Sequence, residues 1–334
     1  MRANQTDTAA RASSTPAGQA AGRPTWRPGI PRWFVQLVAD PKAAVGLFIL
    51  FFFVVVTAVA PFIWTGDPME SHNSLLPYVL TPPSAHHWFG TDVANRDIFL
   101  QFINGGRQTL FLGFAVGVIA TILSVSVGVT AGYFGGWVDE ILSTITNVFL
   151  VLPPLPVCIV VASYITVKSE VPIALVIAAI AWAWSARVYR AQAMSIRSKD
   201  FVEAAIVSGE SGFRIVWREV LPNMISIVVS GFIGVTTFAI LFSVALDFLG
   251  FANNAPMSWG RILYFAQISG AVQAGKWWAY MFAGVAVTLV SLGLILVNFG
   301  VDALSNPRLR VEKVKVPRRP AVSPMAATAG APSH

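Results

Sequence analysis

The sequence contains very little cysteine and very few charged residues. Its 334 residues include one cysteine, Cys158, which excludes an internal disulfide framework and a cysteine metal cluster. Asp, Glu, Lys and Arg together make up 12% of the chain, whereas a soluble domain averages about one quarter charged residues. Hydrophobic residues make up 55%. This composition argues against a water-soluble globule and favours a protein that lies mainly in a bilayer.

The patterns that carry catalysis or bind nucleotides are also missing. His86 and His87 are adjacent, so their side chains diverge in regular structure, and no HExxH motif accompanies them. The segment Gly270 to Lys276 nearly spells a phosphate-binding loop, but Trp277 stands where a hydroxyl residue would hold magnesium. We therefore expect no catalytic residue, no metal site and no cofactor bound by this chain.

Long windows without Asp, Glu, Lys or Arg dominate the sequence. They are Ala43 to Gly66, Gln108 to Val138, Ile141 to Val167, Val171 to Ala186, Val220 to Leu246 and Trp277 to Val301. A membrane crossing needs about 20 residues. Only the fourth window is short, and Lys168 and Arg187 can extend from its ends to the interface, although a buried or re-entrant segment is the alternative. The prediction is an all-α membrane protein with six transmembrane helices.

The basic residues predict the orientation of these helices. The N-terminal stretch, the connector from Arg187 to Arg218 and the C-terminal tail carry six Lys or Arg residues each, and all other connectors together carry five. With six spans the three basic segments lie on one side, and positively charged loops favour the cytoplasm. Both termini are therefore predicted to be cytoplasmic. Because the basic residues flank spans, they favour membrane lipid over nucleic acid as a partner.

The composition also suggests how the chain is divided. Residues 1–30 are predicted to form a disordered cytosolic arm. Residues 31–106 would contain an interfacial helix, the first span and an extracytoplasmic loop, and residues 107–305 a core of five spans with a coupling loop at 200–223. Residues 306–334 are predicted to be a basic, disordered cytosolic tail.

Prolines and one acid interrupt the apolar windows. Pro153, Pro154 and Pro156 predict a kink or an unwound turn in the third span, which either lines a substrate path or is a static bend. Asp247 is either a functional intramembrane acid or a residue that stabilises a helix end at the outer interface, and we favour the second interpretation. Small residues that suit close helix packing recur four apart in the second span, at Gly113, Gly117, Gly128 and Gly132.

The connector between the fourth and fifth windows predicts two short helices. Asp200 can cap the first helix, and Glu203 can reach back in the reciprocal capping arrangement. Gly209 supplies the left-handed position that ends this helix. The second helix is expected over residues 211–220, with Pro222 as an early residue of the fifth span. A rigid, exposed pair of short helices suits docking into a groove on a cytosolic partner.

The spacing in this connector resembles the EAA loop that marks permease subunits of ABC importers. The resemblance is carried by Glu203, Ala204, Ala205, Gly209, Leu221 and Pro222. It implies the ABC type-1 importer permease fold and coupling to an ATPase subunit, with Phe213 and Arg214 also in the coupling surface. Ile206 and Glu219 differ from the residues that are usual in this loop.

A second segment, His87 to Asp97, resembles the peptide/nickel class of these permeases. Its matching residues are Phe89, Gly90, Thr91, Asp92, Arg96 and Asp97. Asn95 stands where the class usually has Gly, and Asn tolerates left-handed backbone angles. The resemblance extends from about Pro41 to Arg310.

Membership of this class would imply a set of partners. They are a homologous second permease, two cytosolic ABC ATPase subunits or domains that hold ATP and magnesium, and an extracytoplasmic substrate-binding protein, all at a bacterial or archaeal plasma membrane. The expected cargo is peptides, with oligosaccharides or nickel complexes as alternatives. The rival classes are an ion-driven secondary transporter and a membrane enzyme. The first would need a set of intramembrane acids and the second a catalytic constellation, and the sequence contains neither.

Overall fold

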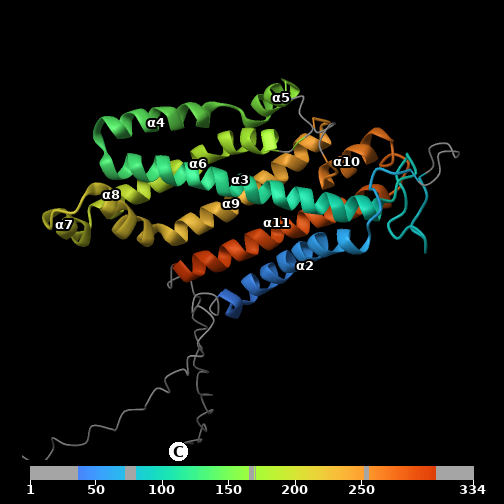
Figure 1. The fold of residues 1–334 in the computed structure, drawn as a ribbon, viewed down its shortest axis with the longest axis horizontal. Coiled ribbons are helices and arrows are strands. Elements are labelled where there is room, and N and C mark those ends of the chain that lie inside the picture. The colour runs from blue at the N-terminus through green and yellow to red at the C-terminus, as the bar shows by residue number, and fades with distance from the viewer. Residues whose placement is uncertain (1–36, 72–79, 165–168, 170, 252–255, 306–334) are drawn as a thin grey trace, which may run out of the picture.

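The protein is a bundle of long helices (Figure 1), described by a computed structural model at residues 37–71, 80–164, 169, 171–251 and 256–305. The helices are α2 (Pro41–Ile63), α3 (Ile98–Phe134), α4 (Gly136–Val151), α5 (Pro154–Tyr164), α6 (Val171–Arg197), α7 (Asp200–Val207), α8 (Gly212–Ile215), α9 (Leu221–Phe248), α10 (Trp259–Ile268) and α11 (Trp278–Ser305). A π-helical turn, η1 (Val216–Val220), joins α8 to α9. The terminal segments expected to be disordered, and most of the expected interfacial helix, lie outside the described residues.

The helices confirm an all-α membrane fold. Five helical stretches are long and apolar enough to cross a bilayer, and α4 with α5 makes a sixth if the bent pair is one span. The predicted windows are shorter than some of these helices. The helix α6 continues eleven residues past Ala186, and α3 begins at Ile98, before the boundary expected at residues 106 and 107. A charge-free window marks only the part of a helix that lies in lipid, whereas the backbone hydrogen bonds continue into water.

The third span is broken where the prolines predicted an interruption. The helix α4 ends at Val151, α5 begins at Pro154, and their axes differ by 85°. Proline has no backbone N–H, and its ring restricts the residue before it to extended angles. The cap residue Leu152 has such angles, with φ −64° and ψ 126°. The expected kink is confirmed.

Glycines bring α3 against its neighbours. A Cβ at Gly128 or Gly132 would overlap backbone carbonyls of α6, and one at Gly113 or Gly117 would overlap side chains of α9. In lipid, helices associate by close packing, which small residues permit. The helix α3 is therefore an interior span, as the spacing of its glycines predicted.

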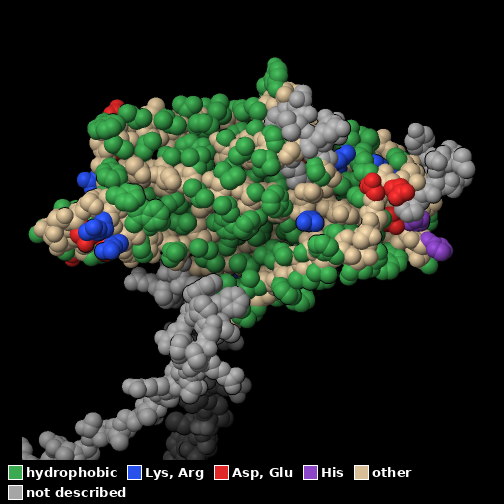
Figure 2. Space-filling view, viewed as in Figure 1, with side chains coloured by type: hydrophobic (Ala, Val, Ile, Leu, Met, Phe, Trp, Pro, Cys, Tyr) green, Lys and Arg blue, Asp and Glu red, His purple; other side chains and the backbone are tan. Residues whose placement is uncertain are grey.

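The two ends of the bundle carry charged side chains of both signs, but the described Lys and Arg residues are more numerous at one of them. The helices α7 and α8 lie at one end, toward which α2 starts and α11 finishes, whereas α5 and α10 lie at the opposite end (Figure 1). Figure 2 shows a broad hydrophobic belt between an end over α7 and α8, where Lys and Arg side chains gather with a few Asp and Glu, and an opposite end where Asp, Glu and His side chains lie beside a few Lys and Arg. The helix ends that flank the three basic segments thus lie toward one end of the bundle, as six alternating spans require.

Candidate coupling loop and membrane cavity

The first helix of the connector starts without a side-chain cap. Its N-cap residue is Lys199, and Asp200 is already the first helical residue, so the expected capping by Asp200 is wrong. The amide of Glu203 donates instead to the carbonyl of Lys199 at 3.2 Å. Asp200 and Glu203 still favour this helix start, because acidic side chains in the first turn interact well with the helix dipole.

The helix α7 ends at a glycine in the left-handed conformation. Gly209 has φ 79°, and the amide of Glu210 donates to the carbonyl of Ala205 at 3.2 Å, which closes the helix end. No heavy atom lies within 4 Å of the position that a Cβ at Gly209 would take. The predicted left-handed helix end at Gly209 is confirmed, and it depends on the backbone angle and not on the space around the residue.

The second half of the connector is not a separate helix. The helix α8 covers only four residues, and the chain then passes through η1 directly into α9. The amide of Leu221 bonds to the carbonyl of Val216, five residues back. Pro222 cannot donate to a carbonyl four residues back, and its ring would clash with that carbonyl in a regular helix. A single widened turn before Pro222 is consistent with this constraint.

One face of the connector is anchored in the bundle. Val202, Ile215 and Val220 are buried in a cluster that also contains Tyr133 of α3 and Tyr189 of α6. The cluster draws on α3, α6, α7, α8, η1 and α9, so the connector is held as part of the rigid bundle.

The opposite face exposes apolar side chains to the surroundings. Val207 is 88% exposed and Phe213 is 70% exposed, and the ring of Trp217 lies 6.1 Å from that of Phe213. Of the predicted coupling residues, the structure exposes Glu203, Ala204, Gly209, Phe213, Arg214 and Pro222, and partly buries Ala205 and Leu221. Sequence reasoning did not identify Val207 and Trp217, although the spacing of Phe213 and Trp217 by four residues places them on one helix face.

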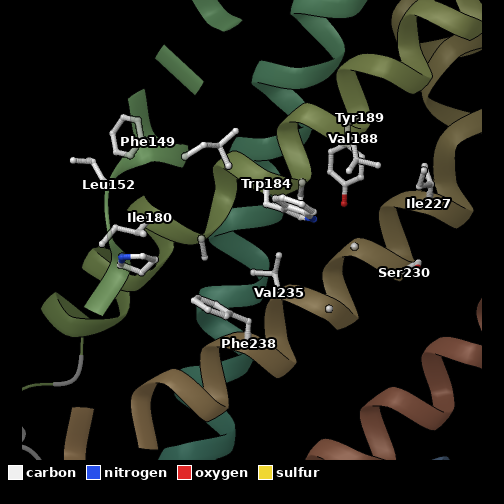
Figure 3. A pocket seen from close by; sticks show the side chains of 16 residues that line it. Phe149, Leu152, Ile180, Trp184, Val188, Tyr189, Ile227, Ser230, Val235 and Phe238 are labelled. Carbon is white, nitrogen blue, oxygen red and sulfur yellow. The ribbon is translucent and has the colours of Figure 1, made fainter. Parts of the chain in front are cut away.

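A cavity of about 600 Å³ opens beside this anchored region. It lies between the α4–α5 junction, α6 and α9 (Figure 3), and its wall includes Trp184, Tyr189, Ser230 and Phe238. Among the described residues, no Asp, Glu, Lys, Arg or His lines it. The Tyr189 hydroxyl points from α6 toward α9, where it donates to the carbonyl of Val228 at 3.3 Å. The cavity is thus largely apolar, with hydroxyl groups as its polar side chains.

The broken third span contributes to this cavity. Leu152 and Pro154, which flank the bend, line the cavity together with Phe149 of α4. The sequence left open whether the proline bend lines a substrate path or is a static bend. The structure places the bend at the wall of this cavity. Tyr189 belongs both to this wall and to the cluster that anchors the connector.

The second predicted motif forms a compact polar turn at the opposite end. The carboxylate of Asp92 accepts from the Arg96 guanidinium at 2.7 and 2.6 Å and from Gln101 of α3 at 3.0 Å. Asn95 has φ 57°, so the residue that replaces the usual Gly does adopt the left-handed angle. Both Asp92 and Arg96 are buried, which identifies them as part of the internal structure of this end.

Other residues of the motif tie this turn to neighbouring helices. Asp97 is the N-cap of α3 and also lies 2.9 Å from His87. Phe89 stacks on Phe282 of α11 with ring centroids 3.8 Å apart. Gly90 has φ 77°, and the side chains of Thr81 and Thr91 share a hydrogen bond of 2.7 Å. The structure therefore brings together all six predicted motif residues, and their contacts fix the loop to the bundle.

Asp247 lies at the end of α9, where it holds the start of α10. The hydroxyl of Ser258, the N-cap of α10, donates to its carboxylate. Burial lowers the pKa of Arg261 in α10, and the nearby carboxylate of Asp247 opposes that shift. This placement supports the interpretation of Asp247 as a helix-end residue. Among the described residues, no group of three or more His, Cys, Asp and Glu could hold a metal ion.

Comparison with known proteins assigns the family. The profile described as "Binding-protein-dependent transport system inner membrane component" matches residues 120–311. The dipeptide transport system permease protein of Alkalihalophilus pseudofirmus is 32% identical over 279 residues, covering 83% of this chain and 89% of the relative. An oligopeptide transport system permease protein of Mycobacterium bovis is 31% identical over 242 residues, covering 69% of this chain and 81% of the relative.

A solved structure supports the same fold. The MetNI methionine ABC transporter in an inward-facing conformation contains a chain that matches with a TM-score of 0.51 and 18% identity, covering 62% of this chain and 96% of that chain. The fold is therefore that of an ABC importer permease. This multi-pass membrane chain belongs to the family of binding-protein-dependent transport system inner membrane components.

Proposed function

We propose that this chain is one of two membrane-spanning subunits of an ATP-driven importer that carries peptides. Its partners are a homologous permease, two cytosolic ABC ATPase subunits or domains that bind ATP and magnesium, and an extracytoplasmic binding protein that delivers the peptide. The relatives named for dipeptide and oligopeptide transport support this substrate class. The basic end of the bundle faces the cytoplasm of a bacterial or archaeal cell.

The exposed apolar face of the connector carries the proposal. A water-facing end of a membrane protein gains nothing by exposing Val207, Phe213 and Trp217, unless a partner covers them. Aromatic side chains of this kind dominate the binding energy of protein interfaces. We assign this face, together with Glu203 and Arg214 beside it, as the surface that docks on the ATPase.

The anchoring of the connector gives a route from the ATPase to the membrane. When two ATPase subunits close on ATP, they displace the docked face. Ile215 and Val216 are buried against the tyrosines of α3 and α6, so the displacement reaches both helices as well as α9. The helices α6 and α9 also form the cavity wall, so their movement changes access to the cavity. This is alternating access driven from outside the substrate path.

The cavity suits a passage better than a binding site of high selectivity. Its wall has hydroxyl groups that can exchange hydrogen bonds with peptide amides, and none of its described residues has a charged side chain that would retain a peptide terminus. We infer that the binding protein sets the selectivity and that this chain provides a neutral path. Oligosaccharides and nickel complexes are the alternative cargoes, and uptake measurements distinguish them.

The test replaces an exposed aromatic on the docking face and a matched aromatic elsewhere at the same end. Phe213→Ala removes a side chain that is 70% exposed, and Trp137→Ala removes one that is 74% exposed at the turn between α3 and α4. The complete transporter is reconstituted in vesicles with its binding protein. Uptake of labelled di- and pentapeptides is measured with ATP inside the vesicles, and maltotriose and a nickel–histidine complex are tested in parallel.

We expect Phe213→Ala to weaken association with the ATPase about tenfold or more and to abolish peptide uptake, because truncating a hot-spot aromatic costs about 2 kcal/mol or more. Trp137→Ala should leave both unchanged. Equal retention of ATPase by the two variants would remove the docking assignment. Peptide uptake that persists without any ATPase would instead indicate an ion-driven carrier.

A further inference from the structure

A second cavity, of about 190 Å³, lies between α3, α4 and α6, on the basic half of the bundle. Its floor is the close contact of α3 and α6 at Gly128, and its walls carry Ser143 and Asn147 of α4 and Arg187 and Arg190 of α6. Its volume is roughly tenfold above the ~10–15 Å³ that holds one water molecule.

The polar groups of this cavity carry one uncompensated positive charge. Arg190 is neutralised by Asp139, whose two carboxylate oxygens lie 2.5 and 2.6 Å from its guanidinium nitrogens, and Ser143 donates to the same carboxylate. Arg187 has only an amide contact, to the Asn147 side-chain oxygen at 3.3 Å. No carboxylate in the described part of the chain lies within ion-pair distance of Arg187. The Arg187 guanidinium and the amide N–H groups of Asn147 thus leave an excess of donors, which suits an anion.

The depth of the cavity along the helices places it at a membrane surface. Arg187 is the first charged residue after the apolar window of α6, and Asp139 and Glu140 directly precede the apolar window of α4. Both helices therefore change from charged to apolar at this level, which is where phospholipid headgroups lie. One turn farther toward the apolar part of α3, Leu123 is exposed on the same helix face as Val127 of the cavity wall. A bound amphiphile would have its charged group in the cavity and an acyl chain along α3.

We propose that Arg187 and Asn147 form a binding site for the phosphate of an anionic phospholipid in the inner leaflet. The Arg190–Asp139 pair holds the α4 wall against α6 and leaves Arg187 available to the lipid. A lipid at this position would sit between α4 and α6, the two helices that also border the translocation cavity. The proposal depends on membrane insertion and on the inward orientation of the basic end, and not on the identity of the cargo.

The test measures lipid binding directly, so it does not depend on transport. The full chain is purified with its partner subunits in mild detergent, and phosphatidylglycerol is titrated while bound lipids are counted by native mass spectrometry. We expect Arg187→Gln to weaken the tightest phosphatidylglycerol site about fivefold, which corresponds to one Lys or Arg charge near a lipid surface. Lys199→Gln removes the same charge from the same end outside the cavity and should leave binding unchanged.

Two further experiments distinguish a lipid phosphate from free phosphate, and a loss of binding from a loss of folding. Arg187→Lys keeps the charge and should retain most of the binding, which a misfolded variant would not. Inorganic phosphate at millimolar concentration should not displace the lipid. Equal lipid binding by Arg187→Gln and Lys199→Gln would overturn the proposal. Displacement of the lipid by inorganic phosphate would also overturn it, as would the finding that the partner permease covers the cavity. Peptide uptake by the wild-type transporter would stand in each of these cases.

Discussion

Gly209 offers the sharpest test of the coupling loop, because its role rests on a single backbone angle. Its φ is 79°, and a Cβ there would meet no heavy atom within 4 Å. A Cβ at this position therefore meets no clash, and we expect the effect of a substitution to come mainly from the left-handed conformation. For an L-residue with a Cβ, that conformation costs roughly 1–2 kcal/mol, and a β-branched residue adopts it least readily.

The expected consequence of a substitution at Gly209 is that the connector adopts its docking conformation less often. A cost of about 1–2 kcal/mol changes a conformational ratio by a factor of about 5 to 30. Gly209→Val should therefore lower peptide-stimulated ATP hydrolysis several-fold or more, whereas Gly209→Asn should retain most of it, because Asn tolerates left-handed angles. Thermal stability of the bundle should change little in either variant, because Gly209 is exposed and the cost falls on the end of α7 and not on the long helices.

The assay compares these variants in the reconstituted transporter, by ATP hydrolysis with and without peptide-loaded binding protein. Ser208→Val is the matched control, because it adds the same side chain one residue earlier, where φ is an ordinary −73°. We expect the wild type, Ser208→Val and Gly209→Asn to have similar rates of peptide-stimulated ATP hydrolysis, and Gly209→Val to have a far lower rate. If Asn and Val at position 209 lowered coupling equally, the backbone argument would be refuted.

Two further predictions concern stability in detergent, measured by thermal unfolding. Gly231→Ala should destabilise the bundle by about 1–3 kcal/mol, because its Cβ would overlap the buried Tyr189 hydroxyl, whereas Gly234→Ala, whose Cβ would meet nothing within 4 Å, should be neutral. Equal melting temperatures for these two variants would contradict the packing described for α6 and α9. Asp92→Ala should cost about 3–5 kcal/mol, because it leaves a buried guanidinium unpaired, and the exposed Glu70→Ala should stay within about 0.5 kcal/mol. A small effect at Asp92 would show that water reaches this ion pair.

Local chemistry allowed much of the fold to be predicted. Apolar windows locate the spans, because lipid demands helices without charge. The left-handed turn at Gly209 and the bend near Pro154 depend on single residue types with strict backbone preferences. The residues of the predicted coupling motif and of the Phe89–Asp97 motif form compact local units, because they are close in sequence, and their roles stay predictions.

Features formed between distant segments were not predictable in the same way. The pair Asp139 and Arg190 joins residues 51 positions apart, and the Arg96 guanidinium lies 4.4 Å from the ring of Phe265, far along the chain. The cavity wall combines residues of α4, α5, α6 and α9, and its neutral lining follows from how these helices pack. The π-helical turn before Pro222 was missed because a proline near a helix start is also compatible with a new helix.

The packing around Tyr189 determines how a force on the docking face must act. The chain runs from α8 through η1 into α9 as continuous helix, so a displacement of Phe213 has no loop in which to dissipate. Tyr189 is buried in the anchoring cluster and also lines the cavity, and Gly231 lets its ring lie directly on α9. Close-packed interiors transmit strain and do not absorb it. In the proposed mechanism, the docking face and the cavity wall therefore move together, so an ATPase that displaces Phe213 opens and closes the cavity without any ligand-triggered group in its wall.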